Sequence, residues 1–124
     1  MNNPEVTMQD IAPATGFDVH DKAINAASIA ISLAMRVPAP LKPIADQVIR
    51  SASSVPANIA EGAGRSGRDR LHHWRIAYGS AKEVDTHLRL LDGAGAINSS
   101  RAEAAIHLFD DVRAITWRLL HPSP

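Results

Sequence analysis

The feature that most constrains the fold is a series of apolar residues spaced alternately three and four positions apart. The series comprises Trp74, Ala77, Ala81, Val84, Leu88 and Leu91. This spacing aligns side chains along one seam of a helix and is typical of left-handed bundle packing at a shallow angle. The alanines allow a neighbouring helix to approach closely. The pattern predicts a helix from about Arg68 to Leu91 within a bundle.

Another helix is predicted from about Val19 to Arg36, with Asp18 as its N-cap. One stripe of apolar residues recurs at helical spacing: Ile24, Ala27, Ile31, Ala34 and Met35. Further apolar residues widen this surface beyond a single stripe: Ala23, Ala26, Ile29, Ala30 and Leu33. A helix with so wide an apolar surface is expected to be covered on more than one side.

Two more helices complete the pattern. One starts near Leu41 and has a regular apolar face: Ile44, Val48, Ala52, Val55 and Ile59. The last is expected to be capped by Ser99 or Ser100, with Glu103 in a capping-box position, and to stop at Pro122. Its seam is a second heptad series: Ala105, Leu108, Val112, Ile115 and Leu119. Short turns between four helices favour an all-α, antiparallel up-down-up-down bundle over residues 18–124, after a flexible lead-in over 1–17.

Composition bounds the class of protein. The 124 residues fit one domain, 45% are apolar, and thirteen basic residues balance thirteen acidic ones. Neutral bulk charge predicts no partner by itself, so a nucleic-acid role needs local charge. The absence of cysteine excludes disulfides and thiolate metal sites. Neither a membrane span nor a secretory signal is visible, and we expect a cytoplasmic protein.

Pro56 lies inside the helical pattern that begins near Leu41. A proline removes one backbone hydrogen bond and costs about 3 kcal/mol in a free helix. Either the helix breaks at Ser54, or it continues with a kink at Pro56. The apolar period stays in register as far as Ile59, which favours the kink. Ser53 and Ser54 hydroxyls are available to the disturbed carbonyls.

A polar stripe follows the same helix. Arg50, Ser54, Asn58 and Glu61 fall within about one quarter of the helical wheel, away from the apolar stripe. The stripe is either a solvated face or a polar interface, within the bundle or between subunits. Nothing in it pairs a nucleophile with a base, so no catalytic residue is predicted.

Gly62, Gly64 and Gly67 end this helix and spell G-x-G-x-x-G. The dinucleotide-binding interpretation fails because that fingerprint follows a strand within a βαβ unit, and no strand is predicted here. No Gly-Lys-Ser/Thr sequence follows, which excludes a phosphate-binding loop. The glycines are interpreted as a helix end and a turn.

Two Glu–His pairs raise the question of a metal site. Glu83 and His87 are four positions apart, as are Glu103 and His107. Carboxylate-bridged di-iron bundles use a spacing of three and further glutamates from the other helices. A pair four apart is more typical of a helix surface. We therefore expect no metal, no cofactor and no enzymatic activity.

The helix over 68–91 carries a second, partly apolar face. Ile76, Gly79, Glu83 and Leu90 cluster on the side opposite its heptad seam. A glycine in the middle of a helix costs about 1 kcal/mol relative to alanine, which is understandable if another backbone packs closely against it. This face is a candidate subunit interface; the alternative is a partly exposed Ile and Leu.

Basic residues concentrate at one turn and the helix start after it. The candidates for phosphate contacts are Arg65, Arg68, Arg70 and Arg75, with His72 and His73 among them. Three interpretations remain open, namely nucleic-acid binding, an acidic patch on a sister subunit, and solvation. The neighbouring Trp74 lies on the heptad seam and is expected in the core.

The stretch 50–65 resembles a known family. Arg50-Ser51-Ala52, Ser54-Val55-Pro56 and Asn58-Ile59-Ala60-Glu61-Gly62 are similar to the core signature of bacterial four-helix-bundle proteins encoded in intervening sequences of large-subunit ribosomal RNA. That family is related to the accessory protein of diversity-generating retroelements. Ile76-Ala77-Tyr78-Gly79-Ser80-Ala81-Lys82-Glu83 looks like its second block. The resemblance covers most of residues 20–120.

The resemblance implies an antiparallel four-helix bundle that assembles as a ring-shaped homopentamer. It implies structural or interfacial roles for the signature positions: Arg50, Ser54, Pro56, Asn58, Glu61, Gly62 and Glu83. The related accessory protein binds nucleic acid and a reverse transcriptase. The sequence thus favours a non-enzymatic assembly or scaffold module, and the alternative is a nucleic-acid-binding accessory factor acting through Arg65–Arg75.

Overall fold

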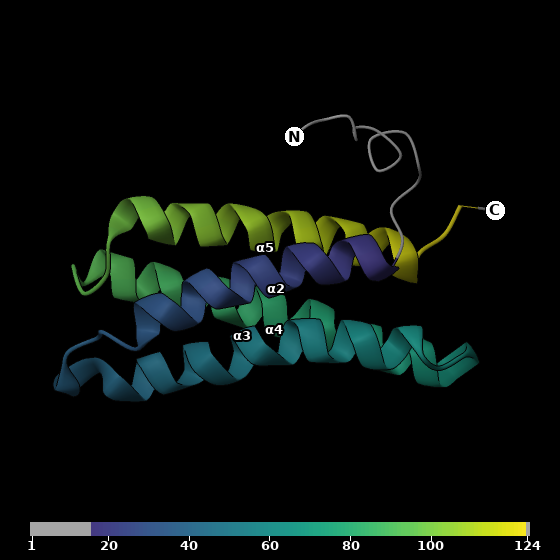
Figure 1. The fold of residues 1–124 in the computed structure, drawn as a ribbon, viewed down its shortest axis with the longest axis horizontal. Coiled ribbons are helices and arrows are strands. Elements are labelled where there is room, and N and C mark those ends of the chain that lie inside the picture. The colour runs from purple at the N-terminus through teal and green to yellow at the C-terminus, as the bar shows by residue number, and fades with distance from the viewer. Residues whose placement is uncertain (1–15, 124) are drawn as a thin grey trace, which may run out of the picture.

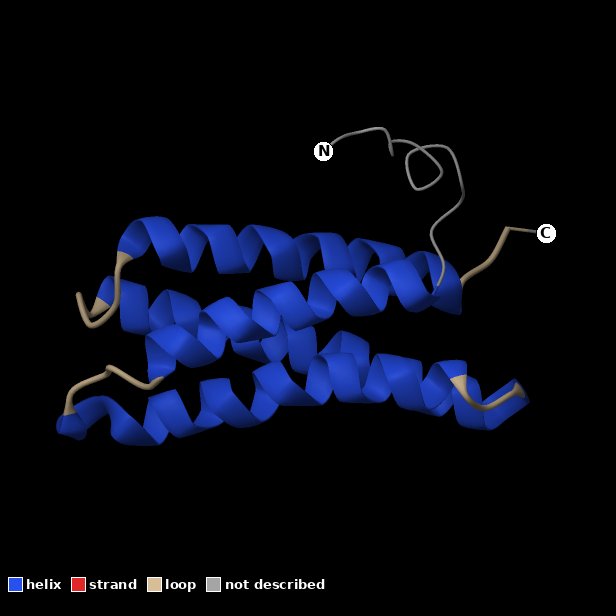
Figure 2. Ribbon diagram, in the orientation of Figure 1, coloured by secondary structure: helices blue, strands red, loops and turns tan. Residues whose placement is uncertain are grey.

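The chain folds into a bundle of four long helices. The computed structural model describes residues 16–123, in which every regular element is helical and no strand occurs (Figure 2). The elements are α2 (Gly16–Ala34), the short 3₁₀ helix η2 (Ala39–Leu41), α3 (Lys42–Ala63), α4 (Gly67–Gly93) and α5 (Ser99–Leu120). The predicted flexible lead-in over 1–17 lies largely outside the described residues, except that Gly16 and Phe17 already belong to α2.

Successive helices run in opposite directions, as the short connections predicted. Each long helix packs along its neighbour in the chain, and α5 closes the bundle against α2. Figure 1 shows the start of α2, the α3–α4 turn and the end of α5 at one end of the molecule. The α2–α3 and α4–α5 connections lie at the opposite end. The predicted antiparallel four-helix bundle is confirmed, with α2 and α4 on one diagonal and α3 and α5 on the other.

The heptad seam of α4 forms the centre of the core. All six of its residues are buried, and Trp74, the most accessible of them, is only 8% exposed. From α5, Phe109 and Val112 pack into the same cluster, together with Val55 and Ile59 of α3. Burying such side chains contributes about 25 cal/mol for each Å² of apolar surface removed from water. The core residues predicted for α4 are therefore confirmed.

The inward face of α2 differs from the prediction. Its buried residues are mostly alanines, including Ala23, Ala26 and Ala30. Two residues of the predicted apolar stripe lie outside the core, because Ile24 is 47% exposed and Met35 is 73% exposed. Alanine lets α2 approach its neighbours closely, and the larger side chains are turned away from this contact. Residues 16–123 leave an apolar surface at Ile24 and Met35 uncovered.

The predicted helix ends need two corrections. Helix α2 begins at Gly16, which places Asp18 within the first turn instead of at the N-cap. Helix α5 is capped by Asn98, whose side-chain oxygen accepts a hydrogen bond from the Arg101 backbone N–H at 2.9 Å. The predicted serine cap was therefore wrong. Asparagine is an equally good cap, so composition alone did not discriminate between adjacent polar residues.

No helix among residues 16–123 combines the length and the apolar character that crossing a membrane requires.

Candidate functional site in the α3–α4 hairpin

Helix α3 passes through Pro56 without interruption. It is a single helix of 22 residues with Pro56 buried inside it. The alternative of a break at Ser54 is therefore wrong, whereas a bend at Pro56 stays a prediction. The nearby hydroxyls bond back to the helix, since Ser51 Oγ donates to the Gln47 carbonyl at 2.7 Å and Ser53 Oγ to the Arg50 carbonyl at 3.1 Å.

The polar stripe of α3 forms a hydrogen-bonded interface with α4. Asn58 Nδ2 donates to the Ser54 carbonyl at 2.9 Å and lies 3.1 Å from Ser54 Oγ. Ser80 Oγ of α4 reaches Ser54 Oγ at 2.9 Å, and His73 Nδ1 lies 2.9 Å from Asn58 Oδ1. The four side chains form one half-buried chain across the hairpin. The interpretation as a polar interface within the bundle therefore holds for Ser54 and Asn58.

The geometry fixes the proton positions in this chain of side chains. Because the Asn58 amide nitrogen donates to Ser54, its oxygen faces His73, and the Nδ1 atom of His73 must carry a proton. Within residues 16–123, no histidine nitrogen or carboxylate contacts the hydroxyl of Ser54 or Ser80, so neither serine has an adjacent base there. General-base activation of a serine requires such a contact. The arrangement is suited to fixing the register of two helices.

A close contact at Gly62 locks the turn end of the hairpin. A Cβ atom at position 62 would lie 2.5 Å from the Cδ1 and Nε1 atoms of Trp74, which leaves room only for glycine. Trp74 Nε1 donates to the Ile59 carbonyl at 3.3 Å. Arg70 Nε and Nη2 donate to the carbonyls of Gly62 and Ala63, at 3.1 and 3.2 Å. The Arg70 guanidinium thus binds two carbonyls of the last turn of α3, the region where a helix leaves carbonyls without an i+4 partner.

Arg65 bridges the turn through acidic neighbours. Its guanidinium approaches the Glu61 carboxylate to 2.7 Å and the Asp69 carboxylate to 3.7 Å. The hydrogen bond from Arg65, reinforced by its charge, lowers the pKa of the Glu61 carboxyl. The same contact raises the pKa of Arg65. Both side chains are exposed, so the pair orders the turn more than it stabilises the fold.

The four candidate phosphate-binding arginines thus divide into two pairs. Arg65 and Arg70 are engaged within the hairpin, whereas Arg68 and Arg75 are exposed and form no ion pair among residues 16–123. The structure brings all four to the turn end of α3 and α4 (Figure 1). Only Arg68 and Arg75 are available to an external anion without loss of an internal contact.

The second face of α4 lies on the outside of the bundle. Ile76 is 37% exposed and Leu90 is 53% exposed. In the described part of the chain, residues 16–123, no atom lies within 4 Å of a Cβ built at Gly79. Glu83 is exposed between them, 4.0 Å from His87. These four residues, Ile76, Gly79, Glu83 and Leu90, are here named the α4 ridge.

An ion-pair cluster that the sequence did not indicate joins α4 to α5. Asp85 is only 9% exposed and receives Arg89 at 2.6 Å and Arg113 at 3.6 Å. The hydrogen bond to Asp85 raises the pKa of Arg89. Arg113 also pairs with Asp110 of α5. The cluster positions α5 against α4 in the way that the Ser54–His73 chain positions α3.

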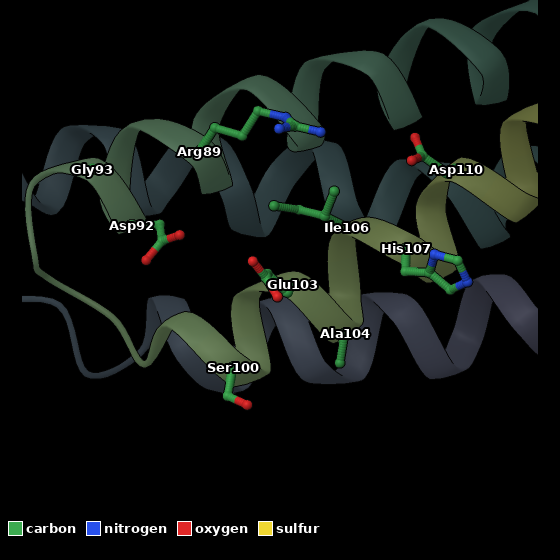
Figure 3. Close-up of a pocket in the computed structure, with 9 residues that line it drawn as sticks. All are labelled: Arg89, Asp92, Gly93, Ser100, Glu103, Ala104, Ile106, His107 and Asp110. Atoms are coloured by element: carbon green, nitrogen blue, oxygen red, sulfur yellow. The ribbon is translucent and has the colours of Figure 1, made fainter.

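Beside this cluster an open groove of about 780 Å³ runs between the end of α4 and the start of α5 (Figure 3). Acidic and basic side chains line it together, with Asp92, Glu103 and Asp110 set against Arg89. His107 projects at its edge (Figure 3). Within residues 16–123 no three His, Cys, Asp or Glu side chains are grouped closely enough to hold a metal ion.

Sequence reasoning found the α3 half of the polar interface and missed the α4 half. In the sequence, Ser80 stands within the second signature block and His73 beside the arginines, and neither position by itself predicts a contact with α3. The signal was nevertheless present, because His73, Ser80 and His87 are spaced by seven and share one side of α4. Asp85 gave no such signal, since its burial depends on arginines from two helices.

Comparison with known proteins identifies the family of the chain. The model of the 23S rRNA-intervening sequence protein family matches residues 16–118. The chain belongs to this family. The match spans all four helices, including both the α3 signature stretch and the α4 block that follows it. Within the 23S rRNA-intervening sequence proteins, therefore, the hairpin described above belongs to the shared domain.

A solved structure supports the same fold. It is a protein of unknown function from the S23 ribosomal protein family of Bacteroides thetaiotaomicron VPI-5482, 23% identical to this chain, with a TM-score of 0.76. The alignment covers 85% of this chain and 96% of that one. At this identity the likeness establishes the fold alone. No curated protein matches the chain significantly.

Proposed function

We propose that this 23S rRNA-intervening sequence protein is a non-enzymatic assembly or scaffold module that forms a ring-shaped homopentamer through the α4 ridge. The observation that carries the proposal is the exposure of Ile76 and Leu90 around an uncovered Gly79. A helix-interior glycine without a contact costs about 1 kcal/mol, and a second backbone packed on it would offset that cost.

The polar groups of the hairpin support a structural role. Its Ser54 and Ser80 hydroxyls, the Asn58 amide and the His73 imidazole are used in contacts between α3 and α4, and among residues 16–123 neither of these serines contacts a histidine or a carboxylate. The four-membered chain holds the α4 ridge in a fixed orientation relative to α3. A rigid ridge loses little conformational freedom on association, which favours binding.

Light scattering across a concentration series tests the proposal. The wild-type protein is expected to show a mass several times the 13.3 kDa of one chain at micromolar concentration. Leu90→Glu places a charge in the proposed contact and should reduce the mass to that of a monomer. Ala104→Glu, at an exposed position of α5, is the matched control and should leave the assembly intact. A monomeric wild-type protein would refute the proposal.

A second candidate function is nucleic-acid binding at the turn end of the hairpin. It is favoured by the exposure of Arg68 and Arg75 without internal partners among residues 16–123. A closed ring would repeat this pair on one rim and so multiply a weak contact. The accessory protein of diversity-generating retroelements, to whose family this chain's signature is related, binds nucleic acid and a reverse transcriptase.

Binding of a labelled structured RNA and a DNA duplex across a salt series tests this second function. The double variant Arg68→Ala with Arg75→Ala should weaken binding and flatten its salt dependence, because phosphate contacts release counterions. Arg118→Ala, which removes an exposed arginine from the end of α5, is the matched control. Absence of binding at low salt would refute phosphate contacts at this turn.

A further inference from the structure

The exposed side of α2 is the least expected apolar surface of the molecule. Ile24 and Met35 are 47% and 73% exposed, and Ile31 between them is only partly covered by the core. Ile24 and Ile31 lie at helical spacing along one side of α2, and Met35, the first residue after its end, continues that spacing through a 3.0 Å backbone hydrogen bond to Ile31. These three residues are named here the α2 ridge. The chain buries alanines of the same helix instead, although larger apolar side chains gain more from burial. Such a surface indicates a second cover outside the protomer.

We infer that the α2 ridge receives the α4 ridge of a neighbouring copy, so that the ring forms by head-to-tail contacts between two different surfaces. This inference rests on the proposed assembly and specifies its contact. The two ridges lie on helices at diagonally opposite corners of the bundle. A contact that repeats around a ring requires two complementary faces on each subunit. Among residues 16–123, four of the five exposed large apolar side chains belong to these two ridges, and the fifth, Trp117 of α5, stacks on His121 of its own chain.

The dimensions of the two ridges agree. Ile24 to Met35 extends about 17 Å and Ile76 to Leu90 about 21 Å, at 1.5 Å per residue. Helices α2 and α4 start at the same end of the bundle and run in the same direction (Figure 1). If neighbouring copies are related by rotation about an axis parallel to the bundle, each residue lies at the same position along that axis in every copy. The ridges therefore face each other over most of their length.

The shapes of the ridges also agree. Gly79 leaves a recess in the α4 ridge that no atom of residues 16–123 fills. A side chain such as Ile24 supplies the knob that packs into such a hole. The formal net charge of the chain is zero, so copies approach one another without net repulsion. These features favour a second copy of this chain as the occupant.

The positions of the ridges favour a closed ring over a filament. On α2 the ridge lies on the side away from Lys22, whose ammonium is 4.0 Å from Asp111 of α5. On α4 it lies away from Asp85, which faces α5. Both ridges are thus turned toward α3, so the two contact surfaces of one subunit lie at an angle to each other instead of on opposite sides. Copies joined through surfaces at an angle follow a curved path, which favours closure over a straight filament.

Cysteine crosslinking tests the contact, because the natural chain contains no cysteine. The double variant Ile24→Cys with Ile76→Cys, treated with a short bismaleimide, should give a ladder of covalent multimers that ends at the ring size. Either cysteine alone should give no crosslinked dimer. Ile24→Cys with Ala104→Cys is the matched control and should give no ladder, since position 104 is exposed on α5 outside both ridges.

The outcomes separate this inference from the proposed function. Self-crosslinking of Ile76→Cys alone would show a symmetric α4–α4 contact and overturn the inference, although assembly itself would stand. A wild-type mass above one chain together with no ladder would mean that another surface receives the α4 ridge. Met35→Glu, at a 73% exposed position, should abolish assembly without loss of helical circular dichroism. A monomeric wild-type protein would refute both proposals.

Discussion

Replacing Gly62 with alanine should destabilise the chain, although alanine is the better helix former. The backbone at Gly62 is helical with no positive φ angle, so alanine is not strained there. Its methyl group, however, lies 2.5 Å from two atoms of Trp74 and 3.1 Å from the Arg70 carbonyl oxygen. Trp74 is only 8% exposed and cannot move aside without disturbing the core.

The expected magnitude follows from three contributions. Overpacking in a filled core costs about 1–3 kcal/mol. Displacement of the Trp74 ring weakens its hydrogen bond to the Ile59 carbonyl, worth about 1 kcal/mol. The higher helix propensity of alanine offsets about 1 kcal/mol of this destabilisation. Gly62→Ala should therefore lower the free energy of unfolding by about 1–3 kcal/mol.

Urea unfolding followed by far-UV circular dichroism measures this difference. The matched control is Gly79→Ala in the same hairpin, where nothing lies within 4 Å of the added methyl group. The control should raise the stability of the monomer by about 0.5–1 kcal/mol, because only helix propensity changes. The comparison is made at concentrations where both variants are monomeric. A Gly62→Ala variant as stable as Gly79→Ala would refute the close-packing argument.

Two further changes probe the polar contacts of the hairpin. Asn58→Ala leaves the half-buried His73 without its partner and should lower the free energy of unfolding by about 1–3 kcal/mol, measured by urea unfolding. Unchanged stability would contradict the claim that Asn58 stabilises the contact between α3 and α4. Glu61→Gln should flatten the acid side of the stability profile. The pKa of Glu61 is lowered by Arg65, so its contribution is present above the ordinary carboxyl pKa of roughly 4.3 and is lost as pH falls through the folded value. The melting temperatures of the wild type and of Glu61→Gln are measured between pH 3 and pH 7 in buffers about one unit apart. If the two melting temperatures fell equally as the pH is lowered, the Arg65 contact would have no effect on stability.

The sequence predicted the architecture well because α4 and α5 carry strict heptad series. Six regularly spaced residues from Trp74 to Leu91 mark the face of α4 that is buried in the core of the protomer. The buried face of α2 was harder to predict. Apolar residues surround most of this helix, and periodicity alone does not show which of its sides packs against the core. Close helix packing selected Ala26 and Ala30 and left Ile24 outside.

The candidate site was predicted in part for a similar reason. The Ser54–Asn58 stripe is visible in the sequence because it follows one side of a single helix. Its partners, His73 and Ser80, depend on the register between two antiparallel helices, which Gly62 and Trp74 set by direct contact. Such a register follows from packing across the turn, and no spacing within one helix encodes it.

Native mass spectrometry of the wild-type chain tests the central claim most directly, because it counts the copies in an assembly. The account predicts a single closed species at five times the 13.3 kDa mass of one chain. It also predicts that this species is absent in Leu90→Glu and retained in Ala104→Glu. A wild-type spectrum containing only the 13.3 kDa chain at micromolar concentration would contradict the account.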